Sequence, residues 1–358
     1  MTVPVAAPTR LAPEESAAVQ EAVAAVVAGT SWILGEQVSI FEAVFAAYVG
    51  SAPELTVGVG NGTDALVVAM TALQLPRGSG VLVAADEGGY AATATRLAGL
   101  EPVAIDVGPR GPTVETAVAG LREGVSALVV THLHGDAVPL DDLDRWRRDL
   151  GLALIEDCAQ SHGLRVDGRH VGQTGDAAAY SFYPTKNLGA VGDAGAVTFA
   201  EVDPAVRARA LRQYGWGSRF KVDLPGGRNS RLDPIQAAVL TARLPFLEGR
   251  NARRRAIAAR YAGHVELYGD RESTVAHHAV ALCDERDKLA ASLGDLGVDT
   301  AVHYPWLVTE MPGLAMVPAA TPVAAARRDR ILSLPCFPEL TDDEVDQVCE
   351  ALEKALDR

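Results

Sequence analysis

Short apolar runs alternate with helix-like segments over the first half of the chain. Four such runs are VLVAA at 81–85, PVAIDV at 102–107, ALVVTH at 127–132 and LALIED at 152–157. Apolar residues at helical spacing separate them, at 64–73, 91–100 and 140–150. Continuous apolar runs are typical of strands covered on both faces. Their alternation with helices predicts an α/β fold with a mostly parallel central sheet.

The remainder of the chain reads mainly as helices. We expect helices at 13–29, 39–49, 203–215, 234–262, 284–294 and 341–356, and a strand at 274–283. Thr341 and Glu344 fit a capping box at the start of the last helix. A chain of 358 residues is long enough for about two domains. We predict an N-terminal tail (1–14), a large domain (15–245) and a smaller C-terminal α+β domain (246–358).

Charge and cysteine content exclude several classes of protein. The formal charge of −14 argues against nucleic-acid binding through a basic surface and against a polybasic membrane contact. No apolar run approaches the roughly 20 residues of a membrane span, and MTVPVAAPTR does not resemble a secretory signal. The four cysteines lie far apart, which indicates free thiols in the cytoplasm.

The glycine-rich segment 58–66 lies between a predicted strand and a predicted helix. Glycines allow a ligand to approach the backbone, and the start of a helix offers free N–H groups to an anion. The third glycine of a dinucleotide fingerprint would fall at Thr63, so the segment does not predict a nicotinamide site. Taken alone, it fits a phosphate site and an ordinary glycine turn equally well.

Glu156 and Asp157 end a predicted strand in the segment IEDCAQSHG at 155–163. The carboxyl ends of strands in open α/β sheets are where ligand-binding groups lie. This pair of carboxylates is consistent with metal binding, with acid–base chemistry, or with a simple helix cap.

Lys186 stands in a small, glycine-rich and mostly uncharged stretch, and it is one of only four lysines. Burial among apolar neighbours lowers the pKa of a lysine and makes its amine a competent nucleophile. An anion-binding helix start, an acid at a strand end and a lysine further along the chain are together the parts of a pyridoxal 5'-phosphate (PLP) site.

Seven segments in order resemble the DegT/DnrJ/EryC1/StrS family of PLP-dependent sugar aminotransferases. They are GNGTDAL, IEDCAQSHG, SFYPTKNLGAVGDAGAV, GGRNSRLDPIQAAVL, NARRRAIAARY, VHYP and LSLPCFPELTDDEV, and they extend from residue 60 to residue 345. The resemblance implies the α/β fold of type I PLP-dependent transferases, with a large domain, a smaller C-terminal domain and a homodimer.

The same resemblance implies roles for the matching residues. Lys186 would form the Schiff base with PLP and carry the proton, and Asp157 would pair with the pyridine nitrogen. Gly62, Thr63 and Ser181 would hold the phosphate.

Further roles follow from the flanking segments. Gln160 would lie near the phenolic oxygen of the cofactor. Tyr90 would stack on its ring, although the preceding ADEGG departs from the proline-containing pattern of the family. Asn229 would reach the phosphate of the other subunit, which places the active site at the dimer interface. His303 and Tyr183 would contact the substrate.

The implied reaction moves an amino group from L-glutamate or glutamine to a keto sugar. The resemblance implies as acceptor a nucleotide-diphosphate keto-deoxysugar, of the 3-keto kind, in antibiotic or glycan biosynthesis. Three alternatives stay open: an aminotransferase for a keto-cyclitol, a PLP-dependent dehydratase and a PLP-binding regulator without turnover. Lys186 disfavours the dehydratase, because those relatives have histidine there.

A pair of histidines could also indicate a metal site. His132 and His134 would share one face of a strand, but no third ligand is evident, so we predict no metal site. His277 and His278 are expected to be structural.

Overall fold

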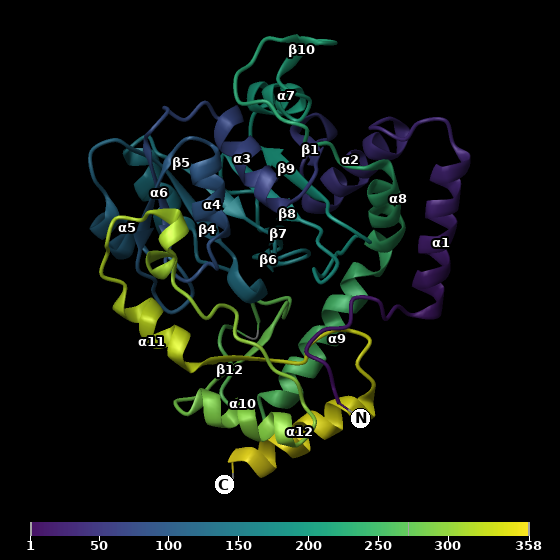
Figure 1. Ribbon diagram of the computed structural model, residues 1–358, viewed down its shortest axis with the longest axis vertical. Helices are drawn as coiled ribbons and strands as arrows, with labels where there is room; N and C mark the ends of the chain where they lie inside the picture. Colours follow the sequence, from purple (N-terminus) through teal and green to yellow (C-terminus); the bar gives the residue numbers. More distant parts are fainter. Residues whose placement is uncertain (1, 271, 357–358) are drawn as a thin grey trace.

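A seven-stranded sheet forms the centre of the protein in the computed structural model, which describes residues 2–270 and 272–356 (Figure 1). Its strand order is β1-β9-β8-β5-β4-β2-β3. The strands are β1 (Thr56–Val59), β2 (Gly80–Ala84), β3 (Glu101–Ile105), β4 (Val125–Thr131), β5 (Ala153–Asp157), β8 (Ala177–Ser181) and β9 (Gly195–Phe199). Five neighbours, from β3 to β8, run parallel, and β9 is antiparallel to both β8 and β1. The predicted α/β fold with a mostly parallel sheet is confirmed.

Helices cover the sheet and build the rest of the chain. They are α1 (Pro13–Ala28), α2 (Glu36–Val49), α3 (Gly62–Ala72), α4 (Tyr90–Leu97), α5 (Val114–Gly120), α6 (Asp141–Asp149), α7 (Val202–Leu211), α8 (Pro234–Arg243), α9 (Leu247–Tyr261), α10 (Arg286–Asp295), α11 (Pro322–Arg330) and α12 (Asp342–Leu356). Three small strand pairs lie outside the main sheet: β6 (Arg165–Val166) with β7 (Arg169–His170), β10 (Trp216–Ser218) with β11 (Lys221–Val222), and β12 (Ala279–Leu282) with β13 (Ile331–Leu334).

Helices bury both faces of the central sheet. Each strand contributes side chains to both faces, because successive side chains of a strand point to opposite sides. In β4, Val129 packs into the core that α3, α4 and α7 close. Its neighbours Leu128 and Val130 pack into the core formed with α5 and α6. A third core joins α2 and α8 to β8 and β9. These continuous apolar strands are therefore explained by helices on both faces.

Several elements differ from the sequence-based expectation. The helix expected at 234–262 is interrupted by a 3-10 turn at Leu244–Phe246 (η3), where Pro245 lacks the N–H that an α-helix requires. The helix expected at 203–215 ends at Leu211, and the chain turns through Tyr214 and Gly215 at positive φ. The strand expected at 274–283 begins only at Ala279.

The C-terminal residues form a separate apolar core. It gathers side chains from α9, α10, α12, β12 and β13. Val3 is also buried in it and pairs with Val298. Both chain ends lie at this end of the molecule (Figure 1). We propose residues 246–358 as the smaller domain because α9 leads from the sheet into this core.

Local expectations about the C-terminal helix and the cysteines are met. The Thr341 N–H donates to Glu344 Oε2 at 3.0 Å, and the Glu344 N–H donates to Thr341 Oγ1 at 3.2 Å, which confirms the capping box. All four cysteines are free thiols. Among the described residues, no helix is both long and apolar enough to cross a membrane.

Candidate active site

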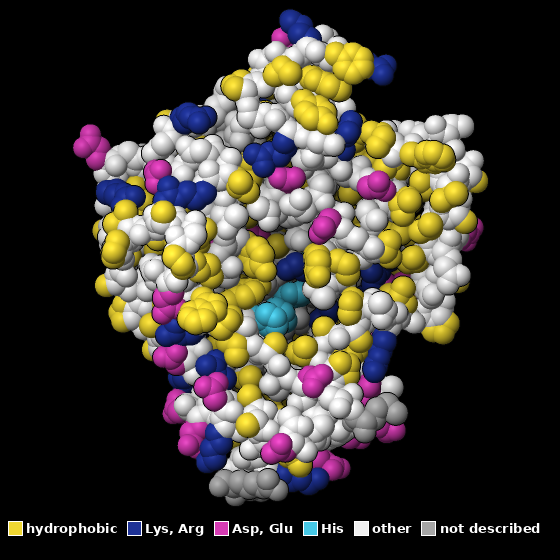
Figure 2. Space-filling model, in the orientation of Figure 1, with side chains coloured by type: hydrophobic (Ala, Val, Ile, Leu, Met, Phe, Trp, Pro, Cys, Tyr) yellow, Lys and Arg dark blue, Asp and Glu magenta, His cyan; other side chains and the backbone are white. Residues whose placement is uncertain are grey.

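A cavity of about 630 Å³ opens where the strands of the central sheet end and α3 begins. Nine of the ten site residues expected from the sequence line it: Gly62, Thr63, Tyr90, Asp157, Gln160, Ser181, Tyr183, Lys186 and His303. Figure 2 shows histidine side chains at the floor of a hollow in the middle of one face. The structure thus brings together residues that lie up to 241 positions apart (303 − 62).

Asp157 is the last residue of β5 and its side chain is almost fully buried. Its carboxylate accepts hydrogen bonds from the Ala159 N–H at 3.0 Å and from Thr131 Oγ1 at 3.3 Å. Burial raises the pKa of Asp157, and the two donors and the Lys186 charge act in the opposite direction. The carboxylate therefore suits a ligand group that carries a proton, such as a pyridinium nitrogen.

Lys186 lies in the loop after β8, where its backbone N–H donates to the Tyr183 carbonyl at 2.8 Å. Burial lowers the pKa of Lys186 to about 8, while the nearby Asp157 charge raises it. Within the described part of the chain, no hydrogen-bond partner is recorded for its amine. A lysine in this state has a substantial neutral fraction near neutral pH, as a nucleophile requires.

The start of α3 forms the end of the cavity that faces Ser181. The Asn61 side chain caps the helix by accepting the Asp64 N–H at 2.8 Å. No acceptor is recorded among the described residues for the N–H groups of Gly62 and Thr63. A Cβ atom at position 62 would lie 2.5 Å from Ser181 Cβ, so only glycine permits this close approach. Free N–H groups at a helix start, beside a serine hydroxyl, fit a phosphate.

Gln160 and two tyrosines form another part of the cavity lining. Gln160 Oε1 accepts the His134 N–H at 2.6 Å, and its Nε2 donates to the Tyr304 hydroxyl at 3.0 Å. The Tyr90 and Tyr304 rings meet edge to face at 5.7 Å, and half of the Tyr90 side chain is exposed. Tyr304 comes from the C-terminal half, so both halves of the chain build the site.

Asn229 does not line the cavity of its own chain. It is exposed and pairs with Gln213 through its backbone. Its neighbour Ser230 accepts the Gly60 N–H at 3.0 Å, which holds the segment beside the start of α3. Its role toward a partner subunit stays a prediction.

Sequence reasoning missed three groups in the cavity: Glu87, Thr131 and the histidine pair His277 and His278. The Glu87 carboxylate accepts the N–H groups of Ala91 and Ala92 at 3.0 and 3.1 Å. Burial raises the pKa of Glu87 to about 7. Thr131 ends β4 beside β5, so the rule that strand ends bind ligands would have found it. His277 and His278, which we expected to be structural, also line the cavity.

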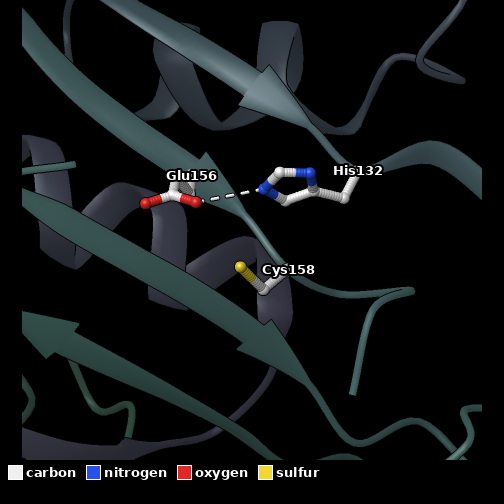
Figure 3. Close-up of side chains that lie close together, drawn as sticks. All are labelled: His132, Glu156 and Cys158. Atoms are coloured by element: carbon white, nitrogen blue, oxygen red, sulfur yellow. Dashed lines mark hydrogen bonds and ion pairs between the residues drawn. The ribbon is translucent and has the colours of Figure 1, made fainter. Parts of the chain in front are cut away.

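A buried cluster of His132, Glu156 and Cys158 resembles a metal site, but its hydrogen bonds explain it (Figure 3). The Val138 N–H donates to His132 Nδ1, so His132 Nε2 carries the proton and donates to Glu156 at 3.1 Å. Burial raises the pKa of Glu156, yet its donors outweigh burial and the net shift is downward.

The oxygens of Glu156 are already occupied. They accept three further N–H groups, from Gly172, Thr174 and Gly175, at 2.7 to 2.8 Å. Burial also raises the pKa of the Cys158 thiol and so keeps it protonated. His134 lies in a 3-10 turn at Leu133–Gly135 with positive φ, so the expectation that His132 and His134 share a strand face is wrong.

The sheet order and the lysine–aspartate cavity define a PLP-dependent enzyme of fold type I. The chain belongs to the DegT/DnrJ/EryC1/StrS aminotransferase family, whose model matches residues 13–353. The protein is therefore a PLP-dependent aminotransferase. The free N–H groups of α3, the Ser181 hydroxyl, Asp157 and Lys186 fit this cofactor.

Individual relatives are similar over nearly the whole chain. A dTDP-3-amino-3,4,6-trideoxy-alpha-D-glucose transaminase of Micromonospora megalomicea is 36% identical, over 96% of this chain and 96% of the relative. The erythromycin biosynthesis sensory transduction protein EryC1 of Saccharopolyspora erythraea is 37% identical, over 91% and 92%. A crystal structure of S. venezuelae DesV with a ketimine intermediate has a TM-score of 0.93 at 34% identity, covering 100% of this chain and 99% of that one.

Proposed function

We propose that this enzyme transfers an amino group from L-glutamate to the keto group of a nucleotide-linked 3-keto-deoxysugar. It acts on a sugar, as its relatives do. The observation that carries the proposal is the single cavity in which Lys186, Asp157 and the free N–H groups of α3 meet. Its volume, about 630 Å³, lies within the range of small-molecule sites and suits a cofactor with a substrate.

Lys186 and Asp157 carry the proposed chemistry. PLP supplies an electron-withdrawing ring that stabilises negative charge on the substrate carbon. Asp157 would hold a proton on the pyridine nitrogen, because its carboxylate faces the cavity and a buried carboxylate favours a positively charged partner. The Lys186 amine, with its pKa lowered to about 8, takes the substrate proton as a base and returns it as an acid.

The remaining residues bind and orient. Gly62, Thr63 and Ser181 hold the phosphate through N–H and hydroxyl groups. Tyr90 fixes the plane of the cofactor ring. Gln160, already oriented by Tyr304 and by the His134 N–H, donates toward the phenolic oxygen.

Substrate contacts and the subunit interface complete the proposal. Tyr183 is half exposed at the cavity and, together with His303, contacts the sugar. Asn229 completes the phosphate site of a second subunit, which makes the active form a homodimer. The proposed location of the enzyme is the cytoplasm, where nucleotide sugars are available.

A second candidate is a regulator that binds PLP without turnover. One relative, EryC1, is named as a sensory transduction protein. A regulator that only binds PLP needs no room for a substrate beside the cofactor. The cavity volume of about 630 Å³ therefore favours the enzyme.

The test is a coupled assay with purified enzyme, PLP and L-glutamate. The acceptors offered are a dTDP-linked 3-keto sugar, a dTDP-linked 4-keto sugar and a keto-cyclitol, and mass spectrometry detects the aminated product. The proposal expects amination of the 3-keto sugar. Preferred amination of the 4-keto sugar or the cyclitol would overturn the acceptor assignment. Cofactor binding without any amination, with glutamine also tried as donor, would favour the regulator.

A further inference from the structure

Lys186 and three histidines lie between two cavities and line both of them. Lys186, His277, His278 and His303 line the main cavity and also a second cavity of about 110 Å³. Residues 5–8 of the N-terminal segment close this second cavity. The lysine side chain therefore borders a space away from Asp157, and imidazole rings form its wall.

The protonation of His277 is fixed by a chain of buried amides. Asn251 Nδ2 donates to the His162 carbonyl at 2.8 Å, so its Oδ1 is left to accept. Asn187 Nδ2 donates to that oxygen at 2.7 Å and to the Val275 carbonyl at 3.1 Å. Because backbone carbonyls only accept, the orientation of both amides follows.

Asn187 Oδ1 is consequently an acceptor, and it lies 2.8 Å from His277 Nδ1. His277 must therefore carry its proton on Nδ1, and Nε2 keeps a lone pair. Among the described residues, no group donates a hydrogen bond to His277 Nε2. This nitrogen is also not one of the fully buried polar atoms that lack a partner. His277 thus presents a hydrogen-bond acceptor to the space beside Lys186.

Lys186 faces carboxylates in the main cavity and neutral rings on its other side. The charged and titratable groups that line the two cavities with it, or lie close to it, are Asp64, Glu87, Tyr90, Asp157, His162, Tyr183, Asp193, His277, His278, His303, Tyr304, Arg10, Arg250, Arg254 and Glu339. Glu339 is held by Arg250, which also pairs with Glu15. Burial, the neighbouring His278 and the Lys186 charge all lower the pKa of His277, so its ring stays neutral.

We propose that His277 is a positioning residue whose Nε2 accepts a hydrogen bond from the Lys186 amine when that amine, free of the cofactor, turns from Asp157 toward the second cavity. This rests on the role proposed above for Lys186. A neutral imidazole orients the amine without adding a negative charge, which would raise the pKa of the lysine strongly. The amine is thereby held inside the site in a form that still exchanges protons.

The first experiment reads the His277 tautomer directly. Nitrogen-15 NMR of histidine-labelled apoenzyme distinguishes protonated from bare ring nitrogens, and a His277→Gln spectrum assigns the signal. The expected result is a protonated Nδ1 and a bare Nε2. A bare Nδ1 would overturn the proposal, and this measurement does not depend on whether other variants fold.

The second experiment measures the pKa of Lys186 in the apoenzyme, from the pH dependence of its acetylation followed by mass spectrometry. His277→Leu removes the acceptor, and His277→Gln keeps an oxygen near the position of Nε2. Since the lone pair stabilises the ammonium form, we expect His277→Leu to lower the pKa by at least about half a unit, and His277→Gln to stay close to wild type.

His264→Leu is the matched control, because His264 pairs with Glu353 away from the cavity. An unchanged Lys186 pKa in His277→Leu, or an equal shift in His264→Leu, would contradict the proposal. Neither measurement requires PLP, substrate or turnover. Failure of the proposed function would instead appear as the absence of a covalent bond between Lys186 and PLP, so the two failures are distinguishable.

Discussion

Individual ionisable residues in the cavity are shifted in directions that burial explains. Burial lowers the pKa of Lys186 and raises that of Asp157 and of Glu87. Charged groups lose hydration in a buried site, and each group therefore moves toward its neutral form. Lys186 and Asp157 partly compensate each other, whereas Glu87 has only N–H donors and the unfavourable Asp157 charge.

Glu87 makes the stability of the apoenzyme depend on pH. Its folded pKa of about 7 lies above the ordinary value of 4.5, so the folded state binds more protons than the unfolded state between these values. Stability from this group is complete below pH 4.5, falls as the pH rises to about 7, and is constant above that.

Glu87→Gln removes this dependence. The difference in unfolding free energy between wild type and Glu87→Gln should change by a few kcal/mol from pH 4.5 to pH 7.5. Urea unfolding at a series of pH values measures it. Glu21→Gln, at an exposed position of α1, is the control and should leave the profile unchanged. Parallel wild-type and Glu87→Gln profiles would show that Glu87 does not titrate in this range.

The helices and strands that carry the site were predicted where their sequence signals are strong. Those with weak secondary-structure propensity were missed. The strand ending at Asp157 was predicted, and the helix expected at 64–73 is found at Gly62–Ala72, because their apolar runs and glycines are strong signals. Strands β8 and β9 were not predicted as strands. The β8 sequence AAAYS is alanine-rich, and alanine favours strands little outside a tertiary context.

Long-range contacts explain what else was missed. Tyr304 contacts Gln160 from a segment 144 positions away, and no local sequence pattern predicts such a contact. The tautomer of His277 likewise depends on Asn187 and Asn251, which only the fold brings together. The family resemblance supplied Tyr90 and Asn229, which periodicity and spacing alone did not indicate.

The contact between α3 and β8 is expected to control phosphate binding. In Gly62→Ala, the new Cβ would lie 2.5 Å from Ser181 Cβ and 3.1 Å from its Cα, so the helix start must move away from β8. PLP affinity should fall by at least about tenfold, because the N–H donors and the hydroxyl no longer converge. Fluorescence titration of the apoenzyme measures it.

Gly249→Ala in α9 is the control for this change. No atom lies within 4 Å of a Cβ added there, so PLP affinity should be unchanged and the helix should be slightly more stable. Equal PLP affinities for wild type and Gly62→Ala would show that this close approach does not shape the phosphate site.

The whole molecule joins a sheet domain and a C-terminal core around one cavity. Tyr304 and His303 enter that cavity from the C-terminal side, and Lys186, Asp157 and Gly62 come from the sheet side. The β10–β11 hairpin projects from the body at the end opposite the chain termini (Figure 1). Asn229, which follows this hairpin, is exposed in the single chain, as the proposed shared site requires.

Mixing two inactive variants tests the shared site. Lys186→Ala and Asn229→Ala should each lose most activity as homodimers. In an equal mixture after subunit exchange, half of the dimers carry one site with both native residues, so about a quarter of wild-type activity should return. Sedimentation analysis verifies the dimer. Mixtures no more active than their separate components would place Asn229 outside the partner's site.

The central claim is that Lys186 binds PLP covalently and that the cofactor accepts the amino group of L-glutamate. An absorption spectrum of the purified protein with PLP, recorded before and after addition of L-glutamate, tests it most directly. Wild type should show the yellow band of lysine-bound PLP, and glutamate should replace it with the band of pyridoxamine phosphate. Lys186→Ala should show no borohydride-reducible bond to the cofactor. A wild-type-like reducible bond in Lys186→Ala, or a wild-type band that neither glutamate nor glutamine alters, would contradict the claim.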